Sequence, residues 1–362
     1  MRKATNSALM KIKNEKIILS LINQGPISRV EISRKSGLTK AAVTIIVDDL
    51  KHRGIVIEKE GKSGTIGRTP VMLFLNKKSF YVVGINISRL DITMGLTDLG
   101  GNIVAQKVFP VCSPQKAFER IKTTFDEQIA ESGIDISQIY RLSVVTPGPV
   151  DVQNGMILNP PNFTEWHNVS IAEKLREITG IDVVLGNVSS ATAIAEKYFG
   201  AAFGTENFLT LQVDEGIGSG IVINDSLFKG SCEIGHTSIK FDGTRCECGN
   251  HGCLEKYASI PHILENTGYK SWKEVVDCED DVLLEKEAEY LSTAIISANN
   301  IFDFDKIVIC GDFTYKPQKI LEHISKKMER NMLSKKKLVV CAGKVGSKLQ
   351  VASAMGINEF FV

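Results

Sequence analysis

The sequence lacks long apolar runs and has almost no net charge. No stretch approaches the roughly 18 apolar residues that a membrane-spanning helix needs, and the Met-Arg-Lys start is not followed by the apolar segment of a secretory signal. We therefore expect a cytoplasmic protein that has no membrane partner. The 362 residues, 43% of them apolar, suffice for a sizeable core and for two or three folding units.

The formal net charge of +1 conceals a strong division along the chain. Residues 1–80 contain 16 Lys/Arg against 6 Asp/Glu, whereas the remainder contains 27 against 36. Lys and Arg side chains near phosphates displace the counterions that condense on nucleic acid, so the basic segment is a candidate for DNA binding. A solvated charged face would have the same composition, and charge by itself leaves both interpretations open.

Three of the eight cysteines lie close together, at Cys246, Cys248 and Cys253. A disulfide scaffold is typical of short secreted chains, so metal binding is the better interpretation here. With His236 these residues offer one imidazole and three thiolates, a set that suits a closed tetrahedral zinc site with no position open for chemistry. The sequence therefore predicts a structural Zn²⁺, with a loop of free thiols as the alternative.

Two helices are predicted at the start of the basic segment. Apolar residues recur at helical spacing from Asn14, and the run ends at Gly25-Pro26. Ser28 precedes Glu31 by three residues, which is the pattern of a capping box. The second helix is therefore expected to be short and to stop at Gly37.

A third helix is predicted to follow Thr39, which is a suitable N-cap. Its inward-facing residues are Val43, Ile46, Val47 and Leu50. Two short helices joined by a Gly-containing turn, with small and polar residues at the exposed start of the second, suit insertion into the major groove. The candidate DNA-binding residues of these helices are Ser28, Arg29, Thr39, Lys40, Ala41 and Thr44.

Residues 55–75 are expected to form two strands joined by a basic tip. The tip carries Lys62 and Arg68 among glycines, so its backbone can lie close to DNA while a cation reaches phosphate or a narrow minor groove. Residues 1–75 are thus predicted to be a mainly helical winged helix-turn-helix domain that binds DNA. A trihelical unit that docks a protein is the alternative.

After a junction at Asn76–Ser79, helices and strands alternate in the manner of an α/β body. Residues 141–146 are predicted to be a strand that feeds a Pro/Gly loop. Residues 208–213 are predicted to be another, running into a glycine loop at Gly216-Ile-Gly-Ser-Gly220.

An ordered set of motifs gives the body a specific family resemblance. They are Thr146-Pro-Gly-Pro-Val-Asp151, Pro161-Asn-Phe-Thr-Glu-Trp166, Gly216-Ile-Gly-Ser-Gly220, Glu233-Ile-Gly-His236 and Cys246-Glu-Cys-Gly-Asn-His-Gly-Cys-Leu-Glu255. In these motifs the chain resembles the ROK family, which comprises sugar kinases and sugar-responsive repressors with a two-lobed actin/hexokinase-like fold. The head, which ends in Gly67-Arg-Thr-Pro70, is similar to that of the repressor branch, which includes xylose repressors and regulators of glucose and N-acetylglucosamine genes.

The resemblance implies a division of the body into two α/β lobes. The first is expected to comprise residues 80–187 together with 346–362, and the second residues 188–345, with the zinc loop and an oligomerisation surface. His236 and the three clustered cysteines match the structural zinc motif of the family.

The resemblance also implies a sugar pocket. ROK kinases hold the sugar through an Asn-Asp pair, through the Glu and His of the Glu-Ile-Gly-His motif, and through a Glu after the last zinc cysteine. The matching residues are Asn187, Glu233, His236 and Glu255, and Asn162 is a further candidate. Carboxylate, amide and imidazole groups suit hydrogen bonding to vicinal hydroxyls. The alternative is that Glu233 and Glu255 only orient the metal ligands.

Three departures from the kinase pattern predict that no phosphate is transferred. The Asp of the family pair, which takes the proton from the sugar hydroxyl, aligns with Val188. The first phosphate loop, Asn86-Ile-Ser-Arg-Leu90, lacks the carboxylate and the glycine of the kinase loop. Asp214-Glu215 places negative charge where a nucleotide phosphate would lie. We therefore expect no catalytic residues and no ATP.

The resulting hypothesis is a sugar-responsive repressor that binds operator DNA as a homodimer or homotetramer. Two alternatives remain at this stage: an ATP-dependent sugar kinase with a regulatory head, and a scaffold whose head binds a protein.

Overall fold

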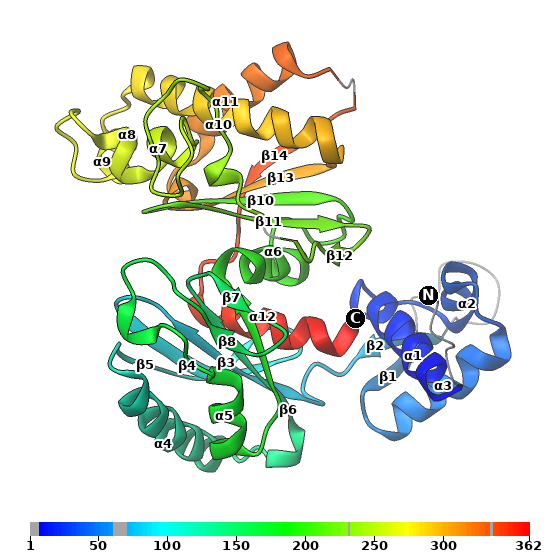
Figure 1. Ribbon diagram of the computed structural model, residues 1–362. Coiled ribbons are helices and arrows are strands. Elements are labelled where there is room, and N and C mark those ends of the chain that lie inside the picture. Colours follow the sequence, from blue (N-terminus) through cyan, green and yellow to red (C-terminus); the bar gives the residue numbers. More distant parts are fainter. Residues whose placement is uncertain (1–6, 61–70, 231, 334–335) are drawn as a thin grey trace. The chain divides into compact units, whose positions relative to one another are not determined.

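The computed structural model describes residues 7–60, 71–230, 232–333 and 336–362. The chain divides into two compact units, residues 1–186 with 348–362 and residues 187–347 (Figure 1). The lobe boundaries expected at 187/188 and 345/346 lie within two residues of this division, and the N-terminal helices fall in the first unit. In the described segments, no helix combines the length and apolar character needed to cross a membrane.

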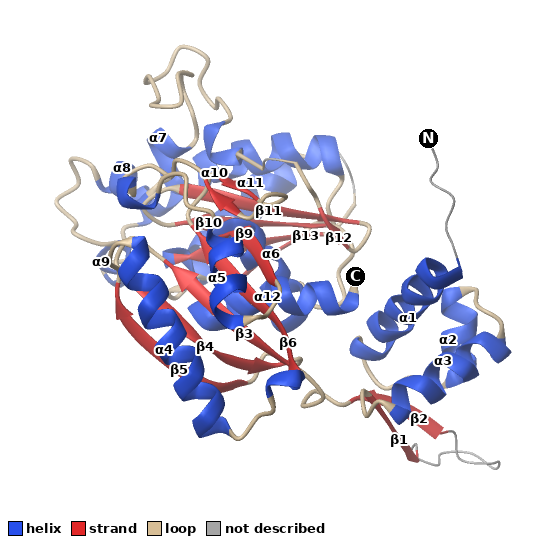
Figure 2. Ribbon diagram, turned by 60° about the horizontal axis from the view of Figure 1, so that its bottom comes forward, coloured by secondary structure: helices blue, strands red, loops and turns tan. Residues whose placement is uncertain are grey.

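Within residues 7–60 and 71–75, the N-terminal region consists of three helices and a two-stranded antiparallel sheet (Figure 2). These elements are α1 (Ser7–Asn23), α2 (Arg29–Ser36), α3 (Lys40–His52), β1 (Val56–Glu60) and β2 (Val71–Leu75). The prediction that the first helix begins at Asn14 was wrong, since α1 begins at Ser7. Met10 and Ile12 near its start are exposed, so the inward-facing apolar periodicity that predicted the helix begins only later along it.

The predicted caps of α2 and α3 are confirmed. The Ser28 hydroxyl accepts a hydrogen bond from the Glu31 amide at 3.3 Å, and the Glu31 carboxylate accepts one from the Ser28 amide at 3.0 Å. Gly37 ends α2 in the left-handed conformation, at φ 72°, and Thr39 accepts from the Ala42 amide at 3.2 Å. All four apolar residues predicted to face inward from α3 are buried.

The remainder of the first unit is built on a five-stranded sheet with the order β5-β4-β3-β6-β9. Its strands are β3 (Tyr81–Ile87), β4 (Asp91–Asp98), β5 (Ile103–Pro110), β6 (Ile139–Thr146) and β9 (Val183–Asn187), and β7 (Val150–Asp151) and β8 (Met156–Ile157) form a separate hairpin. Its helices are α4 (Pro114–Ser132), α5 (Ile171–Thr179) and α12 (Lys348–Phe361).

Alternate residues of β3 show how the first sheet is covered on both faces. Val83 and Ile85 share a core with α4 and α5. Gly84 faces α12, where an added Cβ would lie 2.4 Å from the Ser353 hydroxyl and 2.9 Å from Leu349. A larger residue would not fit at Gly84, because the terminal helix α12 packs directly on the backbone of the central strand β3 (Figure 1).

The second unit contains a five-stranded sheet with the order β12-β11-β10-β13-β14. Its strands are β10 (Phe208–Val213), β11 (Ile217–Ile223), β12 (Ser226–Leu227), β13 (Lys306–Gly311) and β14 (Val339–Ala342). Its helices are α6 (Val188–Phe199), α7 (Glu255–Ala258), α8 (Ile260–Leu264), α9 (Trp272–Asp277), α10 (Asp281–Phe302) and α11 (Gln318–Asn331). Leu209 and Leu211 of β10 share the main core with α10 and α11, whereas Phe208 packs with Ala193 of α6.

Of the glycine loop predicted at residues 216–220, only Gly216 lies in the turn, and residues 217–220 form the first half of strand β11, which pairs antiparallel with β10. The glycines are explained by the close packing of α6 on this strand. An added Cβ at Gly218 would lie 2.1 Å from the Ser189 hydroxyl oxygen, and one at Gly220 would lie 2.6 Å from the Ala193 Cβ. A run of glycines therefore marked a close helix–strand contact, and the loop prediction was wrong.

Candidate functional site

The exposed start of α3 carries three of the predicted DNA-binding residues. Lys40, Ala41 and Thr44 are exposed, and the Thr44 hydroxyl donates to the Lys40 carbonyl at 2.9 Å. The hydroxyls of Ser28 and Thr39 are engaged in the helix caps. These two residues therefore fix the ends of α2 and α3, and any contact they make to a ligand would be additional to that role.

Arg29, predicted to contact DNA, is held by two carboxylates of its own chain. Its Nη2 lies 2.6 Å from Asp48 Oδ1 on α3 and 2.7 Å from Glu58 Oε1 on β1, and Lys51 also pairs with Glu58. The hydrogen bond from Arg29 lowers the pKa of the Asp48 carboxyl below its ordinary value. The guanidinium joins α2, α3 and β1, so a phosphate would have to compete with both acids.

Strands β1 and β2 pair antiparallel, with Val56 opposite Leu75 and Glu60 opposite Val71. The predicted tip residues Lys62 and Arg68 lie outside the described residues.

His236, Cys246, Cys248 and Cys253 lie together in the second unit. Their ligand atoms are all within 4.8 Å of one another. Cys246 Sγ is 3.6 Å from His236 Nδ1, and Cys248 Sγ is 3.6 Å from Cys253 Sγ. The Asn250 backbone amide lowers the pKa of the Cys248 thiol, and burial raises that of Cys253 to about 12. These four residues could hold a metal ion, which binds thiolates in place of their protons.

Backbone turns bring the four ligand residues together. His236 ends the 3₁₀ turn Ile234–His236, and isolated bridges pair Ser238 with Cys253 and Arg245 with His251. The loop is further fixed by Tyr257 of α7, whose hydroxyl accepts from the Thr244 amide at 2.8 Å.

Glu255, predicted to bind sugar, contacts the start of β11. Its Oε2 accepts a hydrogen bond from the Ile217 amide at 2.8 Å, and a Cβ added to Gly216 would lie 2.8 Å from the same oxygen. The alternative that Glu255 only orients the metal ligands does not account for this contact.

The other predicted sugar residues of the second unit lie near the same strand end. Asn187 caps α6, with its side chain accepting from the Ser190 amide at 2.8 Å, and the neighbouring Ser189 meets β11 at Gly218. Glu233 precedes the turn Ile234–His236 and His236 ends it, and Gly235 within this turn packs against Ile217. Asn162 belongs to the first unit, where it is exposed with φ 55°.

Val188, which aligns with the family's catalytic Asp, is the half-buried first residue of α6. Asn86 of the first phosphate segment is buried in β3, paired with Thr93 and Val145. Arg89 donates twice to the Pro161 carbonyl, at 3.1 and 2.9 Å.

Two carboxylates lie at the ends of the parallel strands β10 and β13. Asp214 accepts from the Gln212 amide nitrogen at 2.7 Å and from the Asp312 backbone amide at 2.9 Å. Burial raises the pKa of Asp312, and the nearby charge of Asp214 raises it further. Asp312 was not predicted as a site residue, although the apolar run of residues 307–310 followed by Gly311 was a signal for a strand end. This acidic pair disfavours a phosphate at these strand ends.

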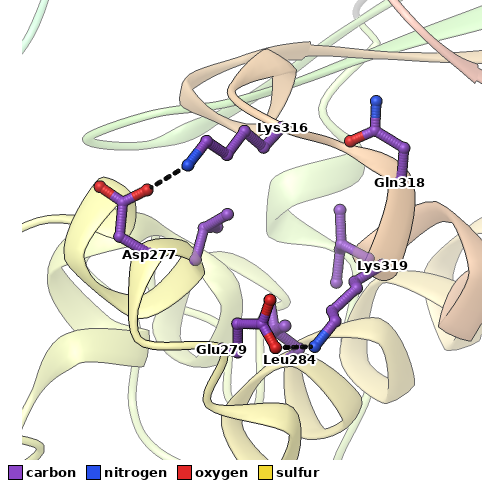
Figure 3. Close-up of a pocket in the computed structure, with 8 residues that line it drawn as sticks. Asp277, Glu279, Leu284, Lys316, Gln318 and Lys319 are labelled. Atoms are coloured by element: carbon purple, nitrogen blue, oxygen red, sulfur yellow. Dashed lines mark hydrogen bonds and ion pairs between the residues drawn. The ribbon is translucent and has the colours of Figure 1, made fainter.

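The second unit also contains a pocket whose lining includes no predicted site residue (Figure 3). Its lining residues are Val276, Asp277, Glu279, Leu284, Lys316, Gln318, Lys319 and Ile320. Lys316 pairs with Asp277 at 2.7 Å, and Lys319 with Glu279 at 2.9 Å. Because its charges are matched internally, the pocket has no evident preference for an ionic ligand.

Known structures define the class of fold. A protein described as a ROK-family transcriptional regulator homologous to the Escherichia coli MLC protein has a TM-score of 0.82 at 23% identity, over 97% of each chain. A ROK hexokinase from Thermus thermophilus has a TM-score of 0.68 at 25% identity, over 78% of this chain and 99% of the hexokinase. The body is thus an actin/hexokinase-like α/β protein, joined to a helical N-terminal region.

Sequence similarity then identifies the family. The model described as the ROK family matches residues 82–361. The chain is 32% identical over 349 residues to the DNA-binding transcriptional dual regulator NagC of Escherichia coli, across 88% of this chain and 85% of that protein. It is 31% identical over 275 residues to the xylose repressor of Bacillus subtilis, across 74% of this chain and 71% of that repressor. The chain belongs to the ROK family, as its motifs predicted.

Proposed function

We propose that the chain is a cytoplasmic, sugar-responsive transcriptional repressor that binds operator DNA through an N-terminal winged helix-turn-helix and does not transfer phosphate. The observation that carries this proposal is its 32% identity to NagC over 88% of the chain. The capped helices α2 and α3, with cationic and small residues at the exposed start of α3, agree with a helix that enters the major groove.

The metal at His236 and the three cysteines is proposed to be a structural Zn²⁺. Ligand atoms of a tetrahedral site with 2.3 Å bonds lie about 3.8 Å apart, close to the two separations of 3.6 Å at this cluster. Four protein ligands would leave no position for a substrate. The ion would order a loop that contains few apolar residues of its own.

Asn187, Glu233, His236 and Glu255, which all belong to the second unit, are proposed to bind the effector sugar. Their polar groups suit hydroxyl recognition, and all four belong to segments that contact the first residues of β11. Sugar binding would change DNA affinity if the sugar favours one of two states of a homodimer or homotetramer.

A search for DNA ligands tests the proposal directly. The full chain would be incubated with a library of duplexes with a random core, and enriched duplexes measured by fluorescence anisotropy across a salt series. Xylose, glucose, N-acetylglucosamine and their phosphates would then be added. We expect that a duplex is enriched and that its affinity for the chain falls as the salt concentration rises. We also expect that one of the sugars releases it. Failure to enrich any duplex would contradict the repressor function.

The second candidate is a sugar kinase, which the likeness to the ROK hexokinase favours. Val188 in place of a proton acceptor and the Asp214–Asp312 pair at the strand ends argue against it. ADP release from ATP with each sugar of the panel distinguishes the two. Turnover at ordinary enzymatic rates, above about 1 s⁻¹, would favour the kinase.

A further inference from the structure

The outward face of α3 has few side chains that are free to hydrogen-bond to a base. Ala41 and Ile45 lie on the side opposite the buried Val43 and Val47, as the 100° spacing of helical residues requires. Ile45 is 69% exposed. A large β-branched side chain is thus presented to solvent on the first two turns of the helix.

The polar groups on this face are already engaged. The hydroxyl of Thr44 bonds to the Lys40 carbonyl, that of Thr39 caps the helix, and the Asp48 carboxylate pairs with Arg29. The helix Lys40–His52 contains no Arg, Asn or Gln, the residues that make most bidentate bonds to guanine or adenine. Lys40 is the one side chain of its first two turns with an ammonium group for a base or phosphate.

The remaining way for this face to distinguish base sequences is contact between its methyl groups and those of thymine. The 5-methyl group of thymine projects into the major groove and is contacted by apolar side chains and by the methyl group of Thr. Ala41, Thr44 and Ile45 all supply methyl groups on the outward side. We infer that these three residues, with Ile45 at the centre, recognise thymine methyl groups in each operator half-site. The inference rests on the proposed DNA-binding function.

Charge favours DNA over an apolar protein surface as the occupant of this face. Residues 1–80 carry ten more basic than acidic residues, and the exposed Arg34 and Lys35 of α2 precede α3 by only a few residues. DNA can pair its phosphates with these cations and place thymine methyl groups against the apolar face of α3.

The test replaces thymine by deoxyuridine, which lacks only the methyl group. The most enriched duplex from the random library would be resynthesised with one thymine replaced at a time, and its affinity for the full chain measured by fluorescence anisotropy. At one or more positions we expect a loss of about fourfold, the value of one buried methyl group. The Ile45→Ala variant should bind the thymine and uracil duplexes equally at the position that Ile45 contacts, and Ile45→Val should retain part of the discrimination there.

Ile12→Ala is the matched control, because Ile12 is also an exposed isoleucine of the N-terminal region but lies on α1. The Ile12→Ala variant should distinguish thymine duplexes from uracil duplexes as strongly as the unmodified chain does. The inference is overturned if no replacement weakens binding, or if Ile45→Ala keeps the full discrimination. Failure to enrich any duplex is a different outcome, since it contradicts the DNA-binding function itself.

Discussion

Glu287 is an acid in the interior of α10 without a hydrogen-bonding partner. Its side chain is fully buried, and neither carboxylate oxygen accepts a hydrogen bond from the described protein atoms. Its neighbours Leu284, Ala288 and Leu291 belong to the main core of the second unit. Burial raises the pKa of this carboxyl well above its ordinary value, so that the neutral form is favoured.

The raised pKa of Glu287 predicts a pH-dependent cost in stability. The unfolded chain ionises this group near pH 4.3, whereas the folded protein retains its proton. Its contribution is therefore most favourable below the unfolded pKa and declines as the pH rises toward the folded pKa, by about 1.4 kcal/mol per pH unit. In urea unfolding, Glu287→Gln should become more stable relative to the unmodified chain between pH 5 and pH 8.

Glu289→Gln is the control for this prediction, because Glu289 is exposed on the same helix. Its stability difference from the unmodified chain should change little over the same pH range. If Glu287→Gln also shows no pH-dependent difference, the carboxyl is not kept protonated by burial.

Among the elements, α2 depends on a reciprocal cap. Ser28→Ala removes the hydroxyl that accepts a hydrogen bond from the Glu31 amide, and it should lower the stability of the helix by about 1 kcal/mol. We expect the amides of α2 to exchange about fivefold faster, measured by hydrogen exchange with mass spectrometry. Ser28→Asp should preserve protection, since Asp is an equally good cap. Unchanged exchange in Ser28→Ala would show that the cap does not limit opening of the helix.

The second element is the loop of residues 237–254, which carries the three clustered cysteines and is proposed to be ordered by the metal ion. Cys253→Ser removes a buried ligand, and we expect it to lose bound zinc and to become sensitive to protease between residues 237 and 254. Zinc content and limited proteolysis measure the two effects. Cys278→Ser, which alters an exposed cysteine outside the cluster, should retain both properties. A purified chain without zinc would contradict the proposed ion.

The elements also show the limits of prediction from sequence. Local signals sufficed for the caps of α2 and α3, because the interacting groups are three residues apart. The glycines of β11 were misread, because their reason is the packing of α6, whose residues precede them by almost thirty positions. The ion pairs of Arg29 were not predicted, because its partners Asp48 and Glu58 are likewise distant in sequence.

For the whole molecule, the division of charge predicts how salt acts on DNA binding. Each phosphate contact made by a cation should contribute about 0.9 to the slope of log affinity against log salt. Lys40→Gln is therefore expected to reduce the slope by about that amount in anisotropy titrations. Lys286→Gln, an exposed position in the second unit, should leave it unchanged. Equal slopes for Lys40→Gln and the unmodified chain would remove Lys40 from the phosphate contacts.

The sequence by itself determined the family, the helix caps and the cluster of four residues that could hold a metal ion, because these depend on residue type and on short spacings. The tertiary structure decided that Glu255 bonds to the start of β11, that Asp312 joins Asp214, and that Glu287 is buried without a partner. Which side chains are buried or paired depends on contacts between distant segments, and only the folded chain brings these together.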